Sequence, residues 1–264
     1  MPADRRRPAR GTGRHFLLPD AARDLARRAR LSESDTVVDI GAGWGALTGE
    51  LARRAGRVIA VEMDAELAAA ARRRLRHQPN VTVVERDFHT WPLPHRPFRV
   101  VANLPFAGST AILGRLLGEP SVPLLRVDAV VQLGAARGWT GASARPDAVS
   151  WHPWYAVRLD RRLSRNAFRP RPSVDAAVLV AARRPQPMLR PHQWRAFARF
   201  VSTGFAGGSV RHQLRGAVTE RSFTRVARDH GLARDPLPTD VPPDAWVALY
   251  RLASGAARRS RSER

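Results

Sequence analysis

The 264-residue chain contains no cysteine and no lysine. The absence of cysteine excludes disulfide bonds, thiolate metal ligands and cysteine nucleophiles. The absence of lysine excludes a lysine base, a Schiff base and the lysine of a phosphate-binding P-loop. No apolar run approaches the roughly 18 residues that a membrane span needs, and the basic N-terminus lacks the apolar core of a secretory signal. We therefore expect a cytoplasmic protein that does not contact a membrane.

Arginine supplies all of the 45 positive charges, which stand against 23 aspartates and glutamates and give a formal net charge of +22. Such a charge on a compact chain predicts a polyanionic partner. Apolar residues make up 44% of the sequence, enough for a hydrophobic core. An arginine-only, alanine-rich composition is also typical of a GC-rich genome, so a single arginine carries little functional information.

The length suits one large domain, or a catalytic domain with a small appendage. Residues 1–14 carry five arginines with two prolines and two glycines, which predicts a flexible basic arm that contacts nucleic acid; a solvated tail is the alternative. We expect an α/β catalytic domain over residues 15–184. Pro185 and Pro187 mark its end, followed by a small helical, RNA-contacting domain over residues 185–254 and a basic tail over residues 255–264.

Apolar, β-branched runs alternate with helical patterns along the first half of the chain. We expect strands at Thr36–Gly41, Arg57–Glu62, Val81–Glu85, Phe98–Asn103 and Val127–Leu133, and helices at Pro19–Arg30, Ala46–Ala55, Ala65–His77 and Thr110–Leu117. This alternation predicts βαβ units and a mostly parallel sheet covered on both faces. We then expect a loop at Gly138–Trp154, two antiparallel edge strands at Trp154–Leu163 and Val174–Ala182, and short helices beyond residue 190.

A glycine-rich turn, Asp39-Ile40-Gly41-Ala42-Gly43-Trp44-Gly45, follows the first of these strands and opens a helix. Glycines let the backbone turn tightly and approach a ligand closely. The helix start adds free N–H groups and the positive end of the helix dipole. The glycine spacing differs from the G-x-G-x-x-G of dinucleotide sites. The turn indicates a nucleoside-type ligand, although turn geometry or packing alone is the alternative.

Carboxylates follow the next two strands. Glu62 ends the second strand, where its carboxylate can hold two vicinal ribose hydroxyls; the alternative is a surface glutamate that starts a helix beside Asp64. Asp87-Phe88 follows the third strand, where the acid can accept a hydrogen bond from an adenine amine while the ring covers the base. Three such signals at successive strand ends predict a nucleoside-binding edge of the sheet.

Four motifs carry a resemblance to a known family. Asn103-Leu104-Pro105-Phe106, at the end of the fourth strand, resembles the N-[LI]-P-[FY] signature of rRNA adenine N6-methyltransferases. The DIGAGWG turn resembles their S-adenosylmethionine motif, GRHFL at residues 13–17 resembles their G-Q-N-F-L box, and FRPRPSV at residues 168–174 resembles their F-x-P-x-P-x-V segment. The motifs follow the family's order over about residues 13–182. The chain most resembles the erythromycin-resistance methyltransferases of 23S rRNA, with the dimethyladenosine transferases of ribosome assembly as near relatives.

The resemblance implies a Rossmann-like class I S-adenosylmethionine-dependent methyltransferase: a mostly parallel seven-stranded sheet over residues 15–184, which bind the cofactor, and a small C-terminal helical domain. It implies cofactor contacts at His15, Leu17, Gly41, Gly43, Gly45, Glu62, Met63, Asp87, Phe88 and Asn103. One departure is that Arg14-His15 replaces the usual Gln-Asn. In the family this asparagine reaches the carboxylate end of the cofactor, where His15 can donate, whereas Arg14 replaces an amide.

The residue types of the tetrapeptide suit methylation of an adenine N6 nitrogen. Its lone pair is delocalised into the ring, so acceptors aimed at the amino hydrogens favour a more nucleophilic, pyramidal nitrogen. The Asn103 side-chain oxygen and the Leu104 carbonyl can serve as these acceptors. Pro105 stiffens the turn, and Phe106 offers a ring on which a flipped base stacks. The alternative is a strand-ending turn with a packed phenylalanine.

For RNA we expect contacts from Arg5, Arg6, Arg7 and Arg10 of the arm, and from Arg161, Arg162 and Arg165 of an arginine-rich segment. The tryptophans around the expected loop favour packing over base stacking. The histidines lack metal-ligand spacing, so we expect no metal. We also expect a monomer.

The sequence thus predicts S-adenosylmethionine-dependent N6-methylation of an unpaired adenine in 23S rRNA, and the resemblance implies macrolide-type antibiotic resistance. A 16S rRNA adenine dimethyltransferase is the first alternative. Two further alternatives are an RNA-binding factor of the same fold without turnover, against which Glu62, Asn103 and Phe106 argue, and an NAD-dependent oxidoreductase, against which the glycine spacing argues.

Overall fold

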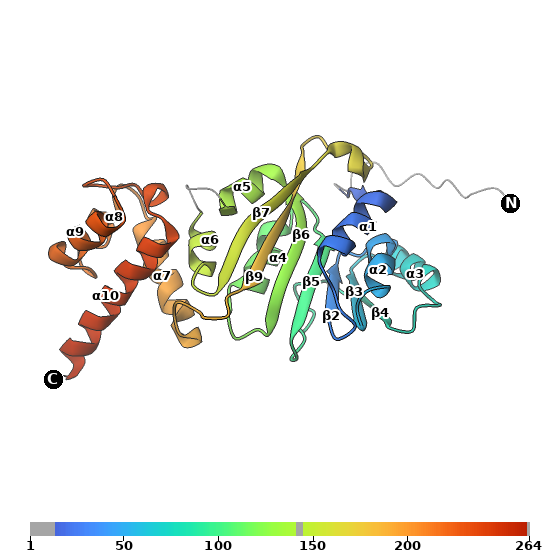
Figure 1. Cartoon of the computed structure of the whole chain (residues 1–264), viewed down its shortest axis with the longest axis horizontal. Coiled ribbons are helices and arrows are strands. Elements are labelled where there is room, and N and C mark those ends of the chain that lie inside the picture. The colour runs from blue at the N-terminus through green and yellow to red at the C-terminus, as the bar shows by residue number, and fades with distance from the viewer. Residues whose placement is uncertain (1–13, 141–144, 263–264) are drawn as a thin grey trace.

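A seven-stranded sheet forms the centre of the protein within residues 14–140 and 145–262, the part of the chain that the computed structural model describes (Figure 1). The strand order is β4-β3-β2-β5-β6-β9-β7. The first five strands in this order run parallel, and β9 is antiparallel to both of its neighbours. The chain reverses its winding direction at β2, between β3 and β5, where α/β proteins of this kind bind their ligands.

The strands are β2 (Thr36–Ile40), β3 (Arg57–Glu62), β4 (Val81–Glu85), β5 (Phe98–Asn103), β6 (Leu124–Gln132), β7 (Tyr155–Leu163) and β9 (Ala176–Arg183). Valines, isoleucines and alanines fill the central strands because both of their faces are buried. A second, two-stranded sheet pairs β1 (Phe16–Leu17) with β8 (Phe168–Arg169), so that residues about 150 positions apart lie side by side.

Helices cover both faces of the sheet. On one face lie α1 (Pro19–Arg28) and α2 (Ala46–Ala52), whose buried residues form one apolar cluster with the strands. On the other lie α4 (Ser109–Leu117), α5 (Leu133–Thr140) and α6 (Pro146–Trp151). The helix α3 (Ala65–Arg74) packs beside β3 and β4 and begins at Asp64, whose side chain accepts a hydrogen bond from the Leu67 amide at 3.1 Å.

The C-terminal helices gather at the end of the molecule beyond α6 (Figure 1). They are α7 (Trp194–Gly204), α8 (Val210–Gln213), α9 (Glu220–Asp229) and α10 (Pro243–Ser262). Their core is continuous with the core of the sheet, because Phe197 of α7 packs edge-on against Trp154 with ring centroids 6.1 Å apart. Within the described residues, no helix is long and apolar enough to cross a membrane.

Two expectations about the middle of the chain were wrong. Part of the expected loop at Gly138–Trp154 is helical, since α5 runs to Thr140 and α6 follows at residue 146. The cause is apolar burial: Trp139, Trp151 and Trp154 are each at most 2% exposed, so packing overrides the local glycines and prolines. The segment expected at Val174–Ala182 is not an edge strand, because β9 lies between β6 and β7.

Candidate active site

A cavity of about 250 Å³ opens at the carboxyl ends of β2, β3 and β5, where the winding of the sheet reverses. Ten of the residues predicted for cofactor binding or catalysis line it: His15, Gly41, Glu62, Met63, Asp87, Phe88, Asn103, Leu104, Pro105 and Phe106. They come from five separate stretches of the chain. The parallel sheet brings four of them together because it places the ends of its parallel strands on one edge, and His15 is held beside them by the small sheet and by Asn103.

The glycine turn shapes one wall of the cavity through its backbone. Gly41, Gly43 and Gly45 all have positive φ angles, between 55° and 77°, which other residues adopt only at a cost. A Cβ atom on Gly43 would lie 2.7 Å from the Phe16 ring, and one on Gly45 would lie 2.8 Å from the Leu75 side chain. Gly43 and Gly45 therefore shape and pack the turn, while Gly41 lines the cavity.

Leu17 does not line the cavity. Its side chain is 7% exposed and belongs to the apolar cluster under α1. It pairs with Phe168 across the small sheet, and strand alternation turns neighbouring side chains to opposite sides. Its neighbour Phe16 lines the cavity and stacks on Trp44, with ring centroids 4.2 Å apart.

The Glu62 carboxylate ties the glycine turn to the end of β3. It is 5% exposed, and it accepts hydrogen bonds from the Gly43 amide at 2.9 Å and from the Asp64 amide at 3.0 Å. Each carboxylate oxygen has more than one lone pair, so both oxygens can still accept from a ligand hydroxyl. The geometry is compatible with the predicted bidentate contact to a ribose, and the two backbone contacts fix the orientation of the carboxylate.

A tight turn carries Asp87 and Phe88 along the cavity wall. The Asp87 carbonyl accepts from the Thr90 and Trp91 amides at 3.1 and 3.0 Å, and its carboxylate accepts from the His89 amide at 2.9 Å. Asp87 is exposed towards the cavity side of the turn, whereas Phe88 is 5% exposed and packs near Trp91. An acceptor and an aromatic wall thus lie next to each other in the cavity.

Only one of the two polar atoms of the Asn103 side-chain amide has a hydrogen-bond partner among the described residues. Its Nδ2 atom donates to the His15 carbonyl at 2.6 Å. Its Oδ1 atom is buried and has no hydrogen-bond partner among the described residues. A buried acceptor without a partner costs free energy, and such atoms concentrate where function needs them. Because Asn103 lines the cavity, this oxygen is available for a donor of a bound ligand.

Phe106 forms a half-buried aromatic surface beside this oxygen. Its ring lies 5.5 Å from the His15 ring and 6.2 Å, edge-on, from the Phe168 ring. His15 in turn contacts the Pro170 carbonyl through Nδ1 at 2.8 Å, and the Leu18 amide donates to the Ala167 carbonyl at 2.8 Å. The GRHFL box and the FRPRPSV segment therefore contact each other, and both contact Phe106 of the Asn103–Phe106 tetrapeptide.

Arg14, which stands where the family has an amide, forms an ion pair with Asp64 at 2.8 Å. The hydrogen bond from Arg14 and the α3 cap both lower the pKa of Asp64. The Asp64 amide also donates to Glu62. This chain of contacts joins the N-terminal box to Glu62 in the cavity wall.

Asp39, which leads the glycine turn, is buried at 1% exposure and accepts from the Thr48 hydroxyl at 2.7 Å. Burial raises the pKa of Asp39 from 3.8 to about 7, and the charge of Glu62 works in the same direction. The folded protein therefore binds this proton in a pH range where the unfolded chain releases it.

Asp39 is expected to make the stability of the protein depend on pH. Its stabilising contribution is fully present below about pH 4 and is lost as the pH rises through about 7, because the folded pKa lies above the unfolded pKa. The free energy of unfolding of the natural protein, relative to Asp39→Asn, should therefore decrease between these values. Urea unfolding at several pH values measures this difference, and a constant difference would contradict the expectation.

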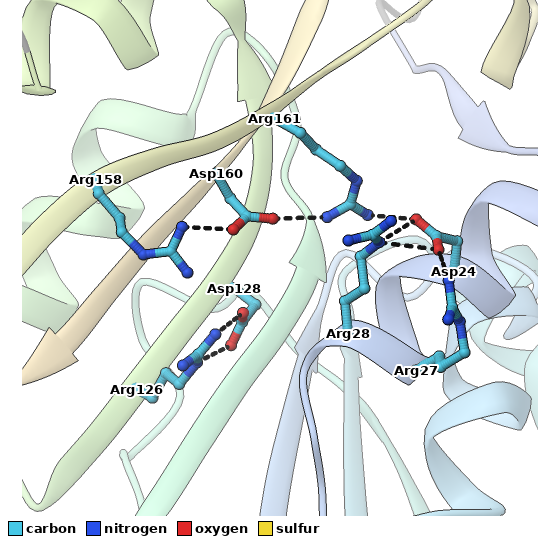
Figure 2. Close-up of polar contacts among 8 residues, drawn as sticks. All are labelled: Asp24, Arg27, Arg28, Arg126, Asp128, Arg158, Asp160 and Arg161. Atoms are coloured by element: carbon cyan, nitrogen blue, oxygen red, sulfur yellow. Dashed lines mark hydrogen bonds and ion pairs between the residues drawn. The ribbon is translucent and has the colours of Figure 1, made fainter.

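The arginine-rich segment spans residues 158–171, and the part of it on β7 forms a network of ion pairs with α1 (Figure 2). Arg161 bridges Asp160 at 2.9 Å and Asp24 of α1 at 2.8 Å. Asp24 also accepts from Arg27 and Arg28, and Asp160 accepts from Arg158 at 2.5 Å. Burial raises the pKa of Asp24 and Asp160, but the hydrogen bonds from the arginines outweigh this effect, so the pKa of both aspartates is lowered. Arg126 and Asp128 of β6 form a separate pair nearby (Figure 2).

The arginines predicted to bind RNA therefore differ in their surroundings. Arg161 is held by two carboxylates at 19% side-chain exposure. Arg162 is exposed, and none of the acids in the described parts of the chain pairs with it. Arg165 lies near Asp175 at 3.5 Å and donates to the Ser173 carbonyl. Arg5, Arg6, Arg7 and Arg10 lie outside the described residues.

Several cavity residues were not predicted as site residues. Arg14 and Phe16 lie inside the GRHFL box, and Arg86 and His89 flank Asp87-Phe88, so their adjacency to these motifs is a sequence signal for them. Ile112 of α4 has no sequence signal beyond the apolar pattern of its helix. Among the residues described, no group of three or more histidines, aspartates and glutamates is placed to hold a metal ion.

A mostly parallel seven-stranded sheet with an antiparallel β9, a glycine turn after β2 and polar side chains at the ends of β3 and β5 define a Rossmann-like methyltransferase. The chain belongs to the ribosomal RNA adenine dimethylase family, whose sequence profile it matches over residues 13–253.

Characterised relatives agree with this membership. An rRNA methyltransferase of Streptomyces thermotolerans is 35% identical over 96% of this chain and 85% of its own length. An rRNA adenine N-6-methyltransferase of Aeromicrobium erythreum is 35% identical over 96% of this chain and 76% of its own length. The crystal structure of the 23S rRNA methyltransferase ErmE superposes with a TM-score of 0.81 and 28% identity, covering 90% of this chain and 99% of that one.

Proposed function

We propose that this protein transfers a methyl group from S-adenosylmethionine to the N6 atom of an unpaired adenine in 23S rRNA, in the cytoplasm, and thereby confers macrolide-type resistance. The observation that carries the proposal is the unpartnered, buried Oδ1 atom of Asn103 in the cavity wall. Sequence similarity to rRNA adenine N-6-methyltransferases and structural similarity to ErmE support it. ErmE is a 23S rRNA methyltransferase, so the structural similarity favours 23S over 16S rRNA as the substrate of this protein.

The cavity has the features that S-adenosylmethionine requires. Glu62 would hold the ribose hydroxyls, Asp87 would accept from the adenine amine with Phe88 against the ring, and the backbone at Gly41 would allow close approach. Arg14 lies in the same cavity and offers a cationic donor for a carboxylate, whereas His15 beside it already donates from Nδ1 to the Pro170 carbonyl. When bound, this cofactor supplies a methyl group already activated on a sulfonium, so the protein needs no metal to activate it.

The protein's own part in the reaction is to orient the target amine. The Asn103 Oδ1 atom would accept one amino hydrogen, and the Leu104 carbonyl would accept the other. The contact between Asn103 Nδ2 and the His15 carbonyl fixes which end of the amide faces the cavity. Phe106 would stack on the extruded base. Positioning of two substrates in this way can supply much of a rate enhancement.

Expression of the protein in a macrolide-susceptible bacterium tests this function. Mass spectrometry and primer extension of both rRNAs should show a methylated adenine in 23S rRNA, and the susceptibility of the strain should fall. A matched strain that expresses Asn103→Ala is the control. Methylation of 16S rRNA alone would identify a dimethyltransferase of ribosome assembly, and binding of rRNA without methylation would indicate a factor without turnover.

Glu62→Ala is expected to weaken S-adenosylmethionine binding by about 10- to 100-fold, because a hydrogen bond to a charged acceptor contributes roughly 1.5–3 kcal/mol. Glu85→Ala is the matched control: Glu85 pairs in register with Glu62 at the end of β4, but it faces Arg72 and lies outside the cavity. Isothermal titration calorimetry measures both affinities. Unchanged affinity in Glu62→Ala would exclude the ribose contact.

Arg162 and Arg161 are expected to respond differently to neutralisation. If Arg162 contacts a phosphate, Arg162→Gln should lower the slope of log affinity against log salt concentration by about 0.7. Arg161→Gln should instead lower the free energy of unfolding by up to about 1 kcal/mol, since Arg161 links Asp24 to Asp160. RNA titrations at several salt concentrations measure the slopes, and equal slopes in both variants would contradict the distinction.

A further inference from the structure

Arg115, on the last turn of α4, contacts the turn that carries Asp87 and Phe88 but does not itself line the cavity. Its guanidinium donates to the Phe88 carbonyl through Nη1 and to the Trp91 carbonyl through Nη2, the latter at 2.5 Å. The same guanidinium lies over the Phe88 ring, 4.9 Å from its centroid. One side chain thus makes three contacts to a turn that lies 24 to 27 positions earlier in the sequence.

These contacts complete the hydrogen bonding of the turn. The Asp87 carbonyl and carboxylate take up the amides of residues 89, 90 and 91. Arg115 donates to the carbonyls of residues 88 and 91. The β4 strand before the turn is only partly buried, so α4 supplies the external support. Arg115 thus fastens to α4 the turn that carries Asp87.

Charge links the two residues as well. Burial lowers the pKa of Arg115, and the nearby Asp87 carboxylate opposes this effect. The guanidinium also has a favourable electrostatic contact with the Phe88 ring face, which is stronger for a partly desolvated cation. A neutral side chain at position 115 would lose both effects together with the two hydrogen bonds.

We infer that Arg115 is a positioning residue that sets the specificity of the cavity for an adenine amine, by holding Asp87 and Phe88 at the ligand. The inference rests on the proposed function, because it takes Asp87 as the acceptor for the adenine of S-adenosylmethionine. Arg115 acts through the turn and does not touch the reacting atoms.

Two cofactor products that differ in the group at the 6-position of the base test this role. S-adenosylhomocysteine carries an amine there, whereas S-inosylhomocysteine carries a carbonyl oxygen, which cannot donate to Asp87, and has a hydrogen on the adjacent N1. Calorimetry should show that the natural protein prefers the former by about tenfold or more. In Arg115→Met this preference should fall to within about twofold, because the turn that carries the acceptor loses its hydrogen bonds to α4.

Arg183→Met is the matched control. Arg183 donates to the carbonyls of Pro120, Val122 and Leu124 and lies over the Tyr155 ring at 5.4 Å, so it resembles Arg115 in its contacts. It lies at the end of β9 beside the start of β6, at the opposite edge of the sheet from the cavity. This control should keep the natural preference even if its thermal midpoint falls.

Arg115→Lys keeps the charge but replaces the planar, forked guanidinium by a compact ammonium, so it should retain an intermediate preference. It also serves as the test if Arg115→Met does not fold. A full preference in a folded Arg115 variant, or equal binding of the two ligands by the natural protein, would overturn the inference. Failure of the natural protein to methylate rRNA would instead overturn the proposed function, because the binding preference is measured without RNA.

Discussion

Asn103→Ala is expected to lower the rate of methyl transfer by about a hundredfold or more, the size of effect seen when one group that stabilises a transition state is removed. The lost Oδ1 atom acts on the geometry of the attacking amine, so the effect should fall on kcat. Single-turnover transfer of a radiolabelled methyl group to rRNA measures it directly.

The structure adds a second consequence of this substitution, because Asn103 Nδ2 also holds the His15 carbonyl. Asn103→Asp separates the two roles: it keeps an acceptor but loses the donor to His15. We expect S-adenosylmethionine affinity to change little in Asn103→Ala and turnover to recover in part in Asn103→Asp. A loss of cofactor affinity as large as the loss of turnover would show that Asn103 mainly holds the N-terminal box.

Phe106→Ala is expected to remove most of the activity, whereas Phe106→Tyr should retain much of it because the ring face is kept. Stacking of a base on an aromatic ring contributes roughly 1–3 kcal/mol, which corresponds to about 5- to 150-fold in RNA binding or turnover. Rates of methyl transfer to rRNA at several RNA concentrations measure this loss for both variants.

Measurements of protein stability distinguish two roles of Phe106: stacking on the target base, or packing in the hydrophobic core. Truncation of a fully buried phenylalanine destabilises a protein by about 3–5 kcal/mol, but Phe106 is only half-buried and borders the cavity. We therefore expect a smaller loss of stability in Phe106→Ala. Phe168→Ala provides the comparison, since Phe168 is fully buried in contact with the same ring. If Phe106→Ala lowers the thermal midpoint as much as Phe168→Ala, Phe106 is a packing residue.

Two arginines link separate elements around the cavity. Arg14 joins the N-terminal box to Asp64 at the start of α3, and Arg115 joins α4 to the Asp87 turn. Both support residues that the proposed function assigns to S-adenosylmethionine. In a protein without lysine, these planar groups can each reach two acceptors at once. Cofactor binding is thus expected to depend on Arg115, which lies outside the recognised motifs, as well as on Arg14 inside the GRHFL box.

The sequence by itself determined the alternation of strands and helices, the glycine turn and the order of the motifs. These are local properties: β-branched runs favour strands, glycine permits positive φ, and a proline after Asn103 ends β5. The same reasoning failed between residues 138 and 154. There the helices depend on the burial of Trp139 and Trp151, which no local pattern reports.

Only the tertiary structure decided how these local pieces combine. It buried Leu17 and left the Oδ1 atom of Asn103 without a hydrogen-bond partner among the residues that the structure describes. It also divided the arginines of β7 into Arg161, held by two carboxylates, and an exposed Arg162. It also placed Arg115 against Phe88. The physical reason is that burial, hydrogen-bond satisfaction and ion pairing depend on which distant residues meet, and that is set by the packing of the whole sheet and its helices.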